Sequence, residues 1–330
     1  MKRRDFLKGT AVLANAAAFG GFGRGRQLTP TPAAASAPCP VTLLAMSGYG
    51  QDMEKEIAAV MSRDGLVLKG KKVLLKPNFV ETHAERPINT NPSVIASVAH
   101  ACLRLGAAEV AVGEASGHRR DPWFSVLNPK LRDVLDRKIR CLDMNHGDAV
   151  QTPNKGGLTG LPQFYLARPV AEADVLISLP KMKTHHWAGV TLCLKNLFGT
   201  LPGIYYGWPK NVLHFRGIER SILDLARTVK VHYNVIDGVV GMEGDGPIMG
   251  KARPVGVLIL SPFSLAADAT AARIMGFDPR KILYLIQAGR FLPGLRPGEV
   301  SLRGENPKRF ATVFDCLDDF KGMRGGPFFS

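Results

Sequence analysis

Lysine and histidine side chains gather in one stretch of the chain, directly after a short apolar run that ends at Pro180. The residues of this stretch, together with one later histidine, are Lys181, Lys183, His185, His186, Lys195 and His214. Ammonium groups attract anions, and a neutral imidazole can take up or release a proton near neutral pH. The stretch therefore predicts a site that binds a small anion and uses a histidine, first of all His185, for proton transfer.

The position of this stretch follows from the apolar run 173–180, which predicts a buried strand stopped by Pro180. In open α/β sheets, ligands bind at the carboxyl ends of the strands. We therefore expect the lysines and histidines to lie in a loop at that edge. Two further loops, 76–87 and 113–120, are expected at the same edge and would bring Arg86 and His118 to the pocket.

Strands and helices are predicted to alternate along the rest of the chain. Strands are expected at 41–46, 72–76, 108–113, 139–143, 232–236 and 254–260, and helices at 53–63, 93–105, 131–138, 218–229, 265–275 and 279–288. This alternation is typical of a parallel sheet with right-handed crossovers. The expected fold is α/β, a mainly parallel Rossmann-like sheet flanked by helices, and the tail from residue 291 is expected to be loop with one strand at 310–314.

The first residues have the composition of an export signal. Arg3 and Arg4 form a twin-arginine signature, a short apolar segment follows at 9–23, and small residues suited to cleavage occur at 33–37. We expect residues 1–37 to be a signal peptide and linker and residues 38–330 to be the α/β domain. The twin-arginine translocase would then carry the folded protein to the periplasm or to another extracytoplasmic compartment. No later segment reaches about 18 continuous apolar residues, so no integral membrane segment is expected in the mature chain.

The overall charge agrees with an anionic ligand. The 330 residues carry a formal net charge of +15, and a basic protein attracts nucleic acid, anionic lipid or a small anion. No nucleic-acid-binding motif is present, which favours a small anion and no nucleic-acid partner. The five cysteines are scattered without a C-x-x-C pair, so no chain-borne iron–sulfur cluster is expected.

A glycine-rich segment, 237–247, predicts a turn after the strand at 232–236. Its carboxylates, Glu243 and Asp245, would repel a phosphate, so the segment is not a phosphate cradle. They are candidates for pairing with the lysines or for binding a metal ion, and a tight structural turn is the alternative. Asp268 is a weaker candidate of the same kind.

Several of these motifs resemble one family. The segments 76–78 (KPN) and 180–185 (PKMKTH), Lys195-Asn196 with Gly199, His214, and the segment 237–247 followed by Gly250 resemble the family of domain of unknown function 362 over roughly residues 40–290. This resemblance implies a family but no activity.

A second, looser resemblance is to the nickel-dependent lactate racemase family. It rests on His185 with Trp187-Ala188-Gly189, on Lys195 with the later segment 201–203, and on Arg86-Pro87 followed by Gly117-His118-Arg119. The resemblance implies that Lys195 carries a covalent nickel-pincer nucleotide and that His214 binds the nickel. It further implies that His118 and His185 are the proton-transfer pair. Apart from this resemblance, Lys181, Lys183, Arg86 and Asn196 are candidates for binding the cofactor or anion.

Three functions therefore remain open. The first is an exported racemase-like enzyme that acts on a small hydroxy acid or related anion with nickel, another divalent metal or a covalent cofactor. The second is a non-catalytic periplasmic protein that binds an anion or a metal through the same lysines. The third is an accessory partner of a redox complex.

Overall fold

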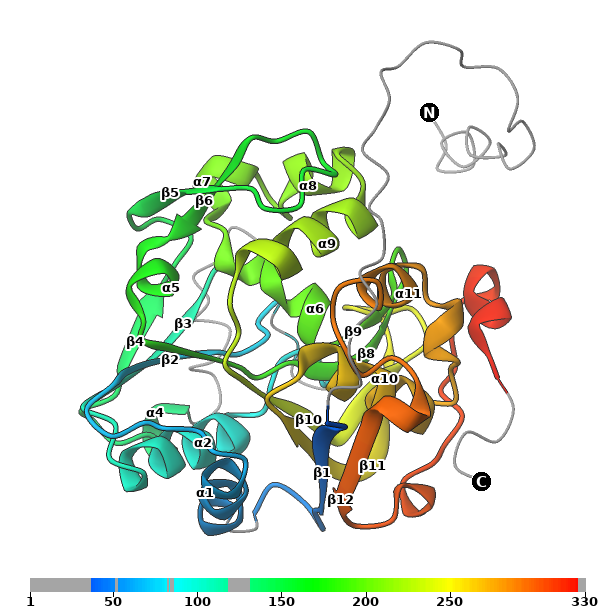
Figure 1. Ribbon diagram of the computed structural model, residues 1–330, viewed down its shortest axis with the longest axis horizontal. Coiled ribbons are helices and arrows are strands. Elements are labelled where there is room, and N and C mark those ends of the chain that lie inside the picture. Colours follow the sequence, from blue (N-terminus) through cyan, green and yellow to red (C-terminus); the bar gives the residue numbers. More distant parts are fainter. Residues whose placement is uncertain (1–36, 51–52, 82, 84–85, 118–130, 326–330) are drawn as a thin grey trace. The chain divides into compact units, whose positions relative to one another are not determined.

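A large sheet forms the centre of the protein, seen in a computed structural model that describes residues 37–50, 53–81, 83, 86–117 and 131–325 (Figure 1). The strand order is β12 (Val300–Gly304), β1 (Cys39–Ala45), β11 (Lys251–Ser261), β10 (Tyr233–Glu243), β7 (Val175–Ser178), β2 (Lys72–Lys76), β3 (Glu109–Glu114) and β4 (Arg140–Asp143). The strands from β10 to β4 run parallel, whereas β11 is antiparallel to both β10 and β1. The predicted α/β class with a mainly parallel sheet is confirmed.

Helices cover both faces of the sheet because its buried strands are apolar on both sides. In β2, Val73 and Leu75 pack with α1 (Glu54–Arg63), α2 (Pro92–Arg104) and the short α4 (Leu131–Val134). Leu74, which points the other way, packs with α9 (Ile218–Thr228), α10 (Ser264–Ile274) and α11 (Leu283–Ala288). Figure 1 shows these two groups of helices on either side of the strands.

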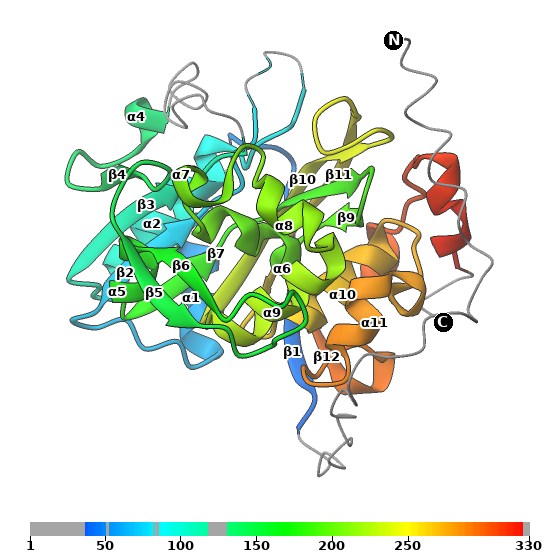
Figure 2. The same cartoon turned by 90° about the horizontal axis from the view of Figure 1, so that it is seen from above.

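The segment that carries the site lies between β7 and α9. It contains β8 (Lys181–His185), β9 (Gly189–Thr191), α6 (Cys193–Asn196), the 3₁₀ helix η2 (Leu197–Thr200), α7 (Gly203–Tyr206) and α8 (Asn211–Phe215). Before it come a hairpin, β5 (Ala149–Pro153) and β6 (Gln163–Ala167), and the short helix α5 (Arg168–Glu172), which Figure 2 shows at one end of the sheet. These elements were not predicted from the sequence.

The prediction of a loop after Pro180 is wrong, because the chain continues in the sheet as β8. The strand β10 is longer than β7: it pairs with β7 at Tyr233 and Asn234 and continues alongside β8, where Asp237 lies opposite Lys181. The prediction of a turn over the whole glycine-rich segment is therefore also wrong. Its residues up to Glu243 form the second half of β10. Gly238 fits there because a Cβ at this position would lie 2.8 Å from the side chain of Met182.

The tail also differs from the prediction. Residues 310–314 form no strand, and β12 pairs instead with β1 at the edge of the sheet. Shorter helices replace two of the expected ones: α4 spans Leu131–Val134, and a 3₁₀ turn, η3 (Pro279–Lys281), precedes α11.

The residues from Ala37 onward form one compact unit. The predicted signal peptide and linker lie outside the described residues. Among the helices that are described, none has the length and apolar character needed to span a membrane.

Candidate anion-binding site

A pocket of about 180 Å³ lies at the ends of β2, β3 and β8. Residues of α6, η2 and α8 also line it. Its lining among the described residues includes Lys76, Asn78, Phe79, Glu114, Lys183, His185, His186, Trp187, Lys195, Asn196, Phe198, Lys210 and His214. The pocket thus brings together five residues that were predicted from the sequence: Lys183, His185, Lys195, Asn196 and His214. The pocket lies at the carboxyl edge of the strands, as expected for this fold.

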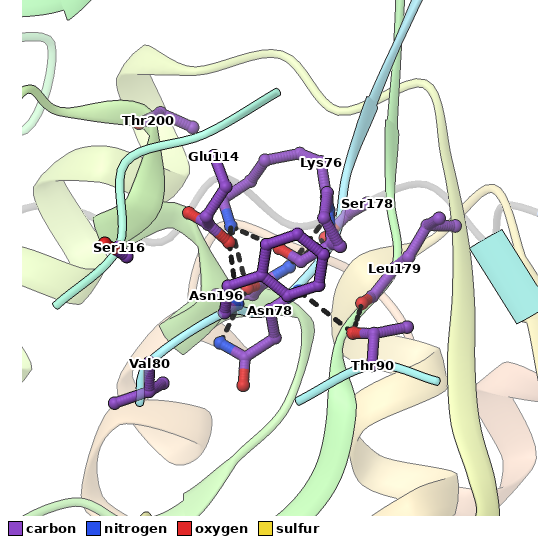
Figure 3. Close-up of polar contacts among 12 residues, drawn as sticks. Lys76, Asn78, Val80, Thr90, Glu114, Ser116, Ser178, Leu179, Asn196 and Thr200 are labelled. Carbon is purple, nitrogen blue, oxygen red and sulfur yellow. Dashed lines mark hydrogen bonds and ion pairs between the residues drawn. The ribbon is translucent and has the colours of Figure 1, made fainter. Parts of the chain in front are cut away.

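In the lining of this pocket, Lys76 and Glu114 form a buried ion pair (Figure 3). The Lys76 ammonium donates to Glu114 Oε2 at 2.9 Å, to Asn196 Oδ1 at 2.9 Å and to the Pro77 carbonyl at 2.6 Å. Glu114 Oε2 also accepts from the backbone N–H of Phe79 at 3.0 Å. The single carboxylate of the described lining therefore already has a cationic partner and leaves the other lysines uncompensated.

Asn196 supports this pair. While its oxygen accepts from Lys76, its amide nitrogen donates to Ser178 Oγ at 2.9 Å. Asn196 and Ser178 are both fully buried. The described contacts thus make Asn196 a residue that positions Lys76.

Three further lysines line the pocket, and burial lowers the pKa of each. The Lys183 ammonium donates to the Ile88 carbonyl at 2.7 Å, and its pKa lies well below the usual value because of burial and the charges of Lys195 and Lys181. Burial, reinforced by the charge of Lys76, lowers the pKa of Lys195 to about 7. Burial also lowers the pKa of Lys210 to about 7, against the opposing effect of Glu114. A bound anion would reverse these shifts.

Lys210 was not recognised from the sequence. It is 2% exposed, and its ammonium donates to Asn145 Oδ1 at 2.8 Å and to the Ser116 carbonyl at 3.3 Å. Its backbone has φ 70° and ψ 47°, in the left-handed region that residues other than glycine seldom adopt. A strained backbone at a buried, pocket-lining cation is typical of a functional position.

Two of the three histidines in the described lining, His185 and His214, have opposite tautomers. His185 Nδ1 accepts hydrogen bonds from the backbone N–H groups of Trp187 (3.1 Å) and Ala188 (3.3 Å), so its neutral ring carries the proton on Nε2. His214 Nδ1 lies 3.1 Å from the Lys210 carbonyl, which can only accept, so this ring carries the proton on Nδ1 and a lone pair on Nε2. Hence His185 can donate a hydrogen bond to a ligand, and His214 can accept one.

Burial keeps both imidazoles neutral. It lowers the pKa of His185 well below its ordinary value, with the charge of Lys195 as the next cause. Burial and then Lys195 lower the pKa of His214 to about 4. The proton-transfer roles of His185 and His118 stay predictions, and His118 lies outside the described residues.

Lys181 and Arg86 contact other groups. Lys181 is fully buried and donates to Asp237 Oδ2 at 2.9 Å and to the Tyr49 hydroxyl at 2.8 Å, away from the pocket lining. The guanidinium of Arg86 lies 3.5 Å from the carbonyl oxygen of Ile248, which is part of the pocket lining. Arg86 itself is not part of that lining.

Glu243 and Asp245 also lie outside the described lining. Glu243 accepts from the backbone of Asp315 at 3.1 Å and lies 3.7 Å from Arg253. Asp245 is half-exposed and pairs with His186 Nδ1 at 3.2 Å. The two carboxylates therefore do not join His214 in a metal site.

A metal or nucleotide cofactor does not fit the residues that are described. Within the described ranges, no three histidine, cysteine or acidic side chains come together to hold a metal ion. The pocket of about 180 Å³ is smaller than the roughly 300–1,000 Å³ that drug-sized ligands occupy. In addition, the amine of Lys195 lies 3.7 Å from the centre of the Phe198 ring, where an attached group would need space.

Asp268 fixes the start of α6, the helix that carries Lys195. Its two carboxylate oxygens accept from the backbone N–H groups of Cys193 at 2.7 Å and Leu194 at 3.0 Å. Burial raises the pKa of this carboxyl to about 7, despite these hydrogen bonds. Asp268 thus positions the lysine without reaching the pocket.

Residues 73–273 match the family model of a domain of unknown function, DUF362. The chain belongs to the DUF362 family. This DUF362 protein is 29% identical over 247 residues to a thylakoid-associated protein from Synechocystis sp., and the match covers 72% of each chain.

Two solved structures are more distant. The lactate racemase apoprotein from Thermoanaerobacterium thermosaccharolyticum is 15% identical, with a TM-score of 0.41 over 73% of this chain and 57% of that one. A protein from Thermotoga maritima is 14% identical, with a TM-score of 0.32 over 62% of this chain and 53% of that one. The DUF362 chain thus spans little more than half the length of either.

Proposed function

We propose that this DUF362 protein binds a small organic anion, a 2-hydroxy or 2-oxo carboxylate, in the lysine-lined pocket. The observation that carries the proposal is the imbalance of charge: Lys183, Lys195 and Lys210 line the pocket, and Glu114 is already paired with Lys76. A carboxylate would supply the missing negative charge and accept charge-assisted hydrogen bonds. No nucleic acid and no nucleotide-sized group is part of this proposal.

The size and the polarity of the pocket support an acid of a few carbon atoms. Its volume of about 180 Å³ is several times the ~30 Å³ that one water molecule occupies in the liquid. The Nε2–H of His185 can donate to a hydroxyl or carbonyl oxygen of the ligand, and the Nε2 lone pair of His214 can accept from a hydroxyl group. Both groups serve recognition whether or not the bound acid reacts.

Replacing either Lys183 or Lys195 by methionine is expected to weaken anion binding about tenfold to a hundredfold. The reason is that a hydrogen bond to a charged group contributes ~1.5–3 kcal/mol, and methionine keeps most of the apolar stem. Isothermal titration calorimetry with lactate and with oxamate at pH 7 measures the change. Lys230→Met is the control, because Lys230 is exposed and outside this pocket. Unchanged affinity in both pocket variants, or no binding to the wild type, would contradict the proposal.

We also propose that the protein is exported folded through the twin-arginine pathway, on the basis of Arg3 and Arg4 and the apolar segment after them. The double variant Arg3→Lys/Arg4→Lys is expected to leave the protein in the cytoplasm, whereas the wild type reaches the periplasm. Cell fractionation followed by immunoblotting measures this, and Lys2→Arg is the control because it keeps the arginine pair. Equal distribution of the wild type and the double variant would exclude this route.

A further inference from the structure

Lys195 differs from the other lysines of the pocket in the contacts of its amine. Lys76 is bonded to Glu114, Lys183 to the Ile88 carbonyl and Lys210 to Asn145. Within the part of the chain that the structure describes, the amine of Lys195 has no hydrogen-bond acceptor or carboxylate partner. It lies over the ring of Phe198 instead, 3.7 Å from its centre.

Burial favours the neutral amine of Lys195 over the ammonium ion, although the face of the Phe198 ring attracts a cation. The charged form loses hydration in the pocket and gains no anionic partner, and Lys76 adds a repulsive charge. With its pKa lowered to about 7, the Lys195 side chain is neutral at neutral pH far more often than an ordinary lysine, whose pKa is ~10.4. A desolvated lysine beside other cations is a nucleophile toward carbonyl carbon.

The neighbouring groups suit a ligand that carries both a carboxylate and a carbonyl group. Lys183 and Lys210 line the same pocket, and a bound carboxylate would favour their ammonium forms, which can donate hydrogen bonds to it. The Nε2–H of His185 is fixed as a donor by the backbone of Trp187 and Ala188 and can polarise the carbonyl oxygen.

We propose that Lys195 forms an imine with the carbonyl carbon of a small 2-oxo acid bound in this pocket. The nitrogen lone pair forms a C–N bond as the carbonyl π pair moves to oxygen. The oxygen then leaves as water with the two hydrogens that were on the amine nitrogen, and a C=N bond remains. No oxidant or reductant is needed. This inference rests on the proposed anion-binding function and narrows it to one class of ligand.

Reductive trapping tests the imine. The full protein is incubated with pyruvate and then with sodium borohydride, which reduces an imine to a stable secondary amine. Intact-mass spectrometry should show one pyruvate-derived adduct per chain, and peptide mapping should place it on Lys195. The variant Lys195→Arg keeps the positive charge but should give no adduct, whereas Lys230→Arg, an exposed control, should be trapped like the wild type.

Binding of oxamate, which has a carboxylate but an unreactive amide carbonyl, separates the two proposals. Oxamate binding without an adduct overturns the imine and leaves the anion site intact. If neither oxamate binding nor an adduct is found, both the anion site and the imine are overturned. Adducts spread over other lysines, or equal trapping in Lys195→Arg, also overturn the imine. Because peptide mapping of the wild type alone identifies the modified lysine, the test does not depend on the folding of a variant.

Discussion

Gly199→Ala is expected to lower the free energy of unfolding by about 3 kcal/mol or more, which is a large effect for the addition of one methyl group. A Cβ at this position would overlap Glu114 Oε1 and lie 2.6 Å from Lys76 Nζ. Neither partner can move away easily, because the Lys76 ammonium already has three acceptors and both groups are buried. Overpacking costs ~1–3 kcal/mol, and disruption of a buried ion pair costs ~3–5 kcal/mol.

Urea denaturation, followed by circular dichroism, measures this loss. Gly298→Ala is the matched control, because a Cβ there meets nothing within 4 Å and neither glycine has a positive φ. The control should change the free energy of unfolding by less than ~0.5 kcal/mol, as an ordinary surface substitution does. An equally small change in the free energy of unfolding of Gly199→Ala would show that Gly199 does not lie against the Lys76–Glu114 pair.

Anion affinity is expected to fall steeply as the pH rises above 7. The pKa values of Lys195 and Lys210 in the free protein are about 7, so the cations that attract the ligand disappear above this pH. For each lysine that must be protonated, the apparent affinity should decrease about tenfold per pH unit above 7. Oxamate is a suitable probe because it does not react with the amine.

Calorimetry can detect the protons directly. At pH 8, oxamate binding should take up protons, and the observed enthalpy should differ between buffers with different ionisation enthalpies. The ligand-free protein should show the linked effect: since the unfolded chain binds more protons than the folded one between pH 7 and 10.5, stability contributed by these lysines rises with pH in that window. Binding that is independent of pH from 7 to 9 would contradict the assignment.

Local sequence signals were sufficient to predict most of the parallel sheet. The start of α2 is an example: a helix was expected at 93–105, and α2 begins at Pro92, where the side chain of Asn91 accepts from the backbone N–H of Ser93. The missed strand β8 has no comparable local signal. Its pairing is set by β10, in which Asp237 lies opposite Lys181 across many intervening residues. Such long-range pairing overrides the apparent stop at Pro180.

The composition of the pocket could be predicted better than the roles of its residues. Basic residues after a buried strand indicated an anion site, and the structure brings Lys183, His185, Lys195 and His214 together. The partner of Lys181 could not be inferred, because Asp237 approaches only in the folded sheet. The ring proton of His185 likewise depends on backbone N–H groups whose direction the sequence does not specify.

The buried pair of Lys76 and Glu114 also bears on the order of folding. Its members are 38 residues apart, and Asn196, which completes the network, is 120 residues from Lys76. Contacts of such sequence separation form late and slowly, because loop-closure entropy is lost before they are gained. In the folded protein α6 brings the lysine cations of the pocket together away from water, where they repel one another. A small anion in the surrounding solution would therefore stabilise the folded protein as a counter-ion, in addition to being its ligand.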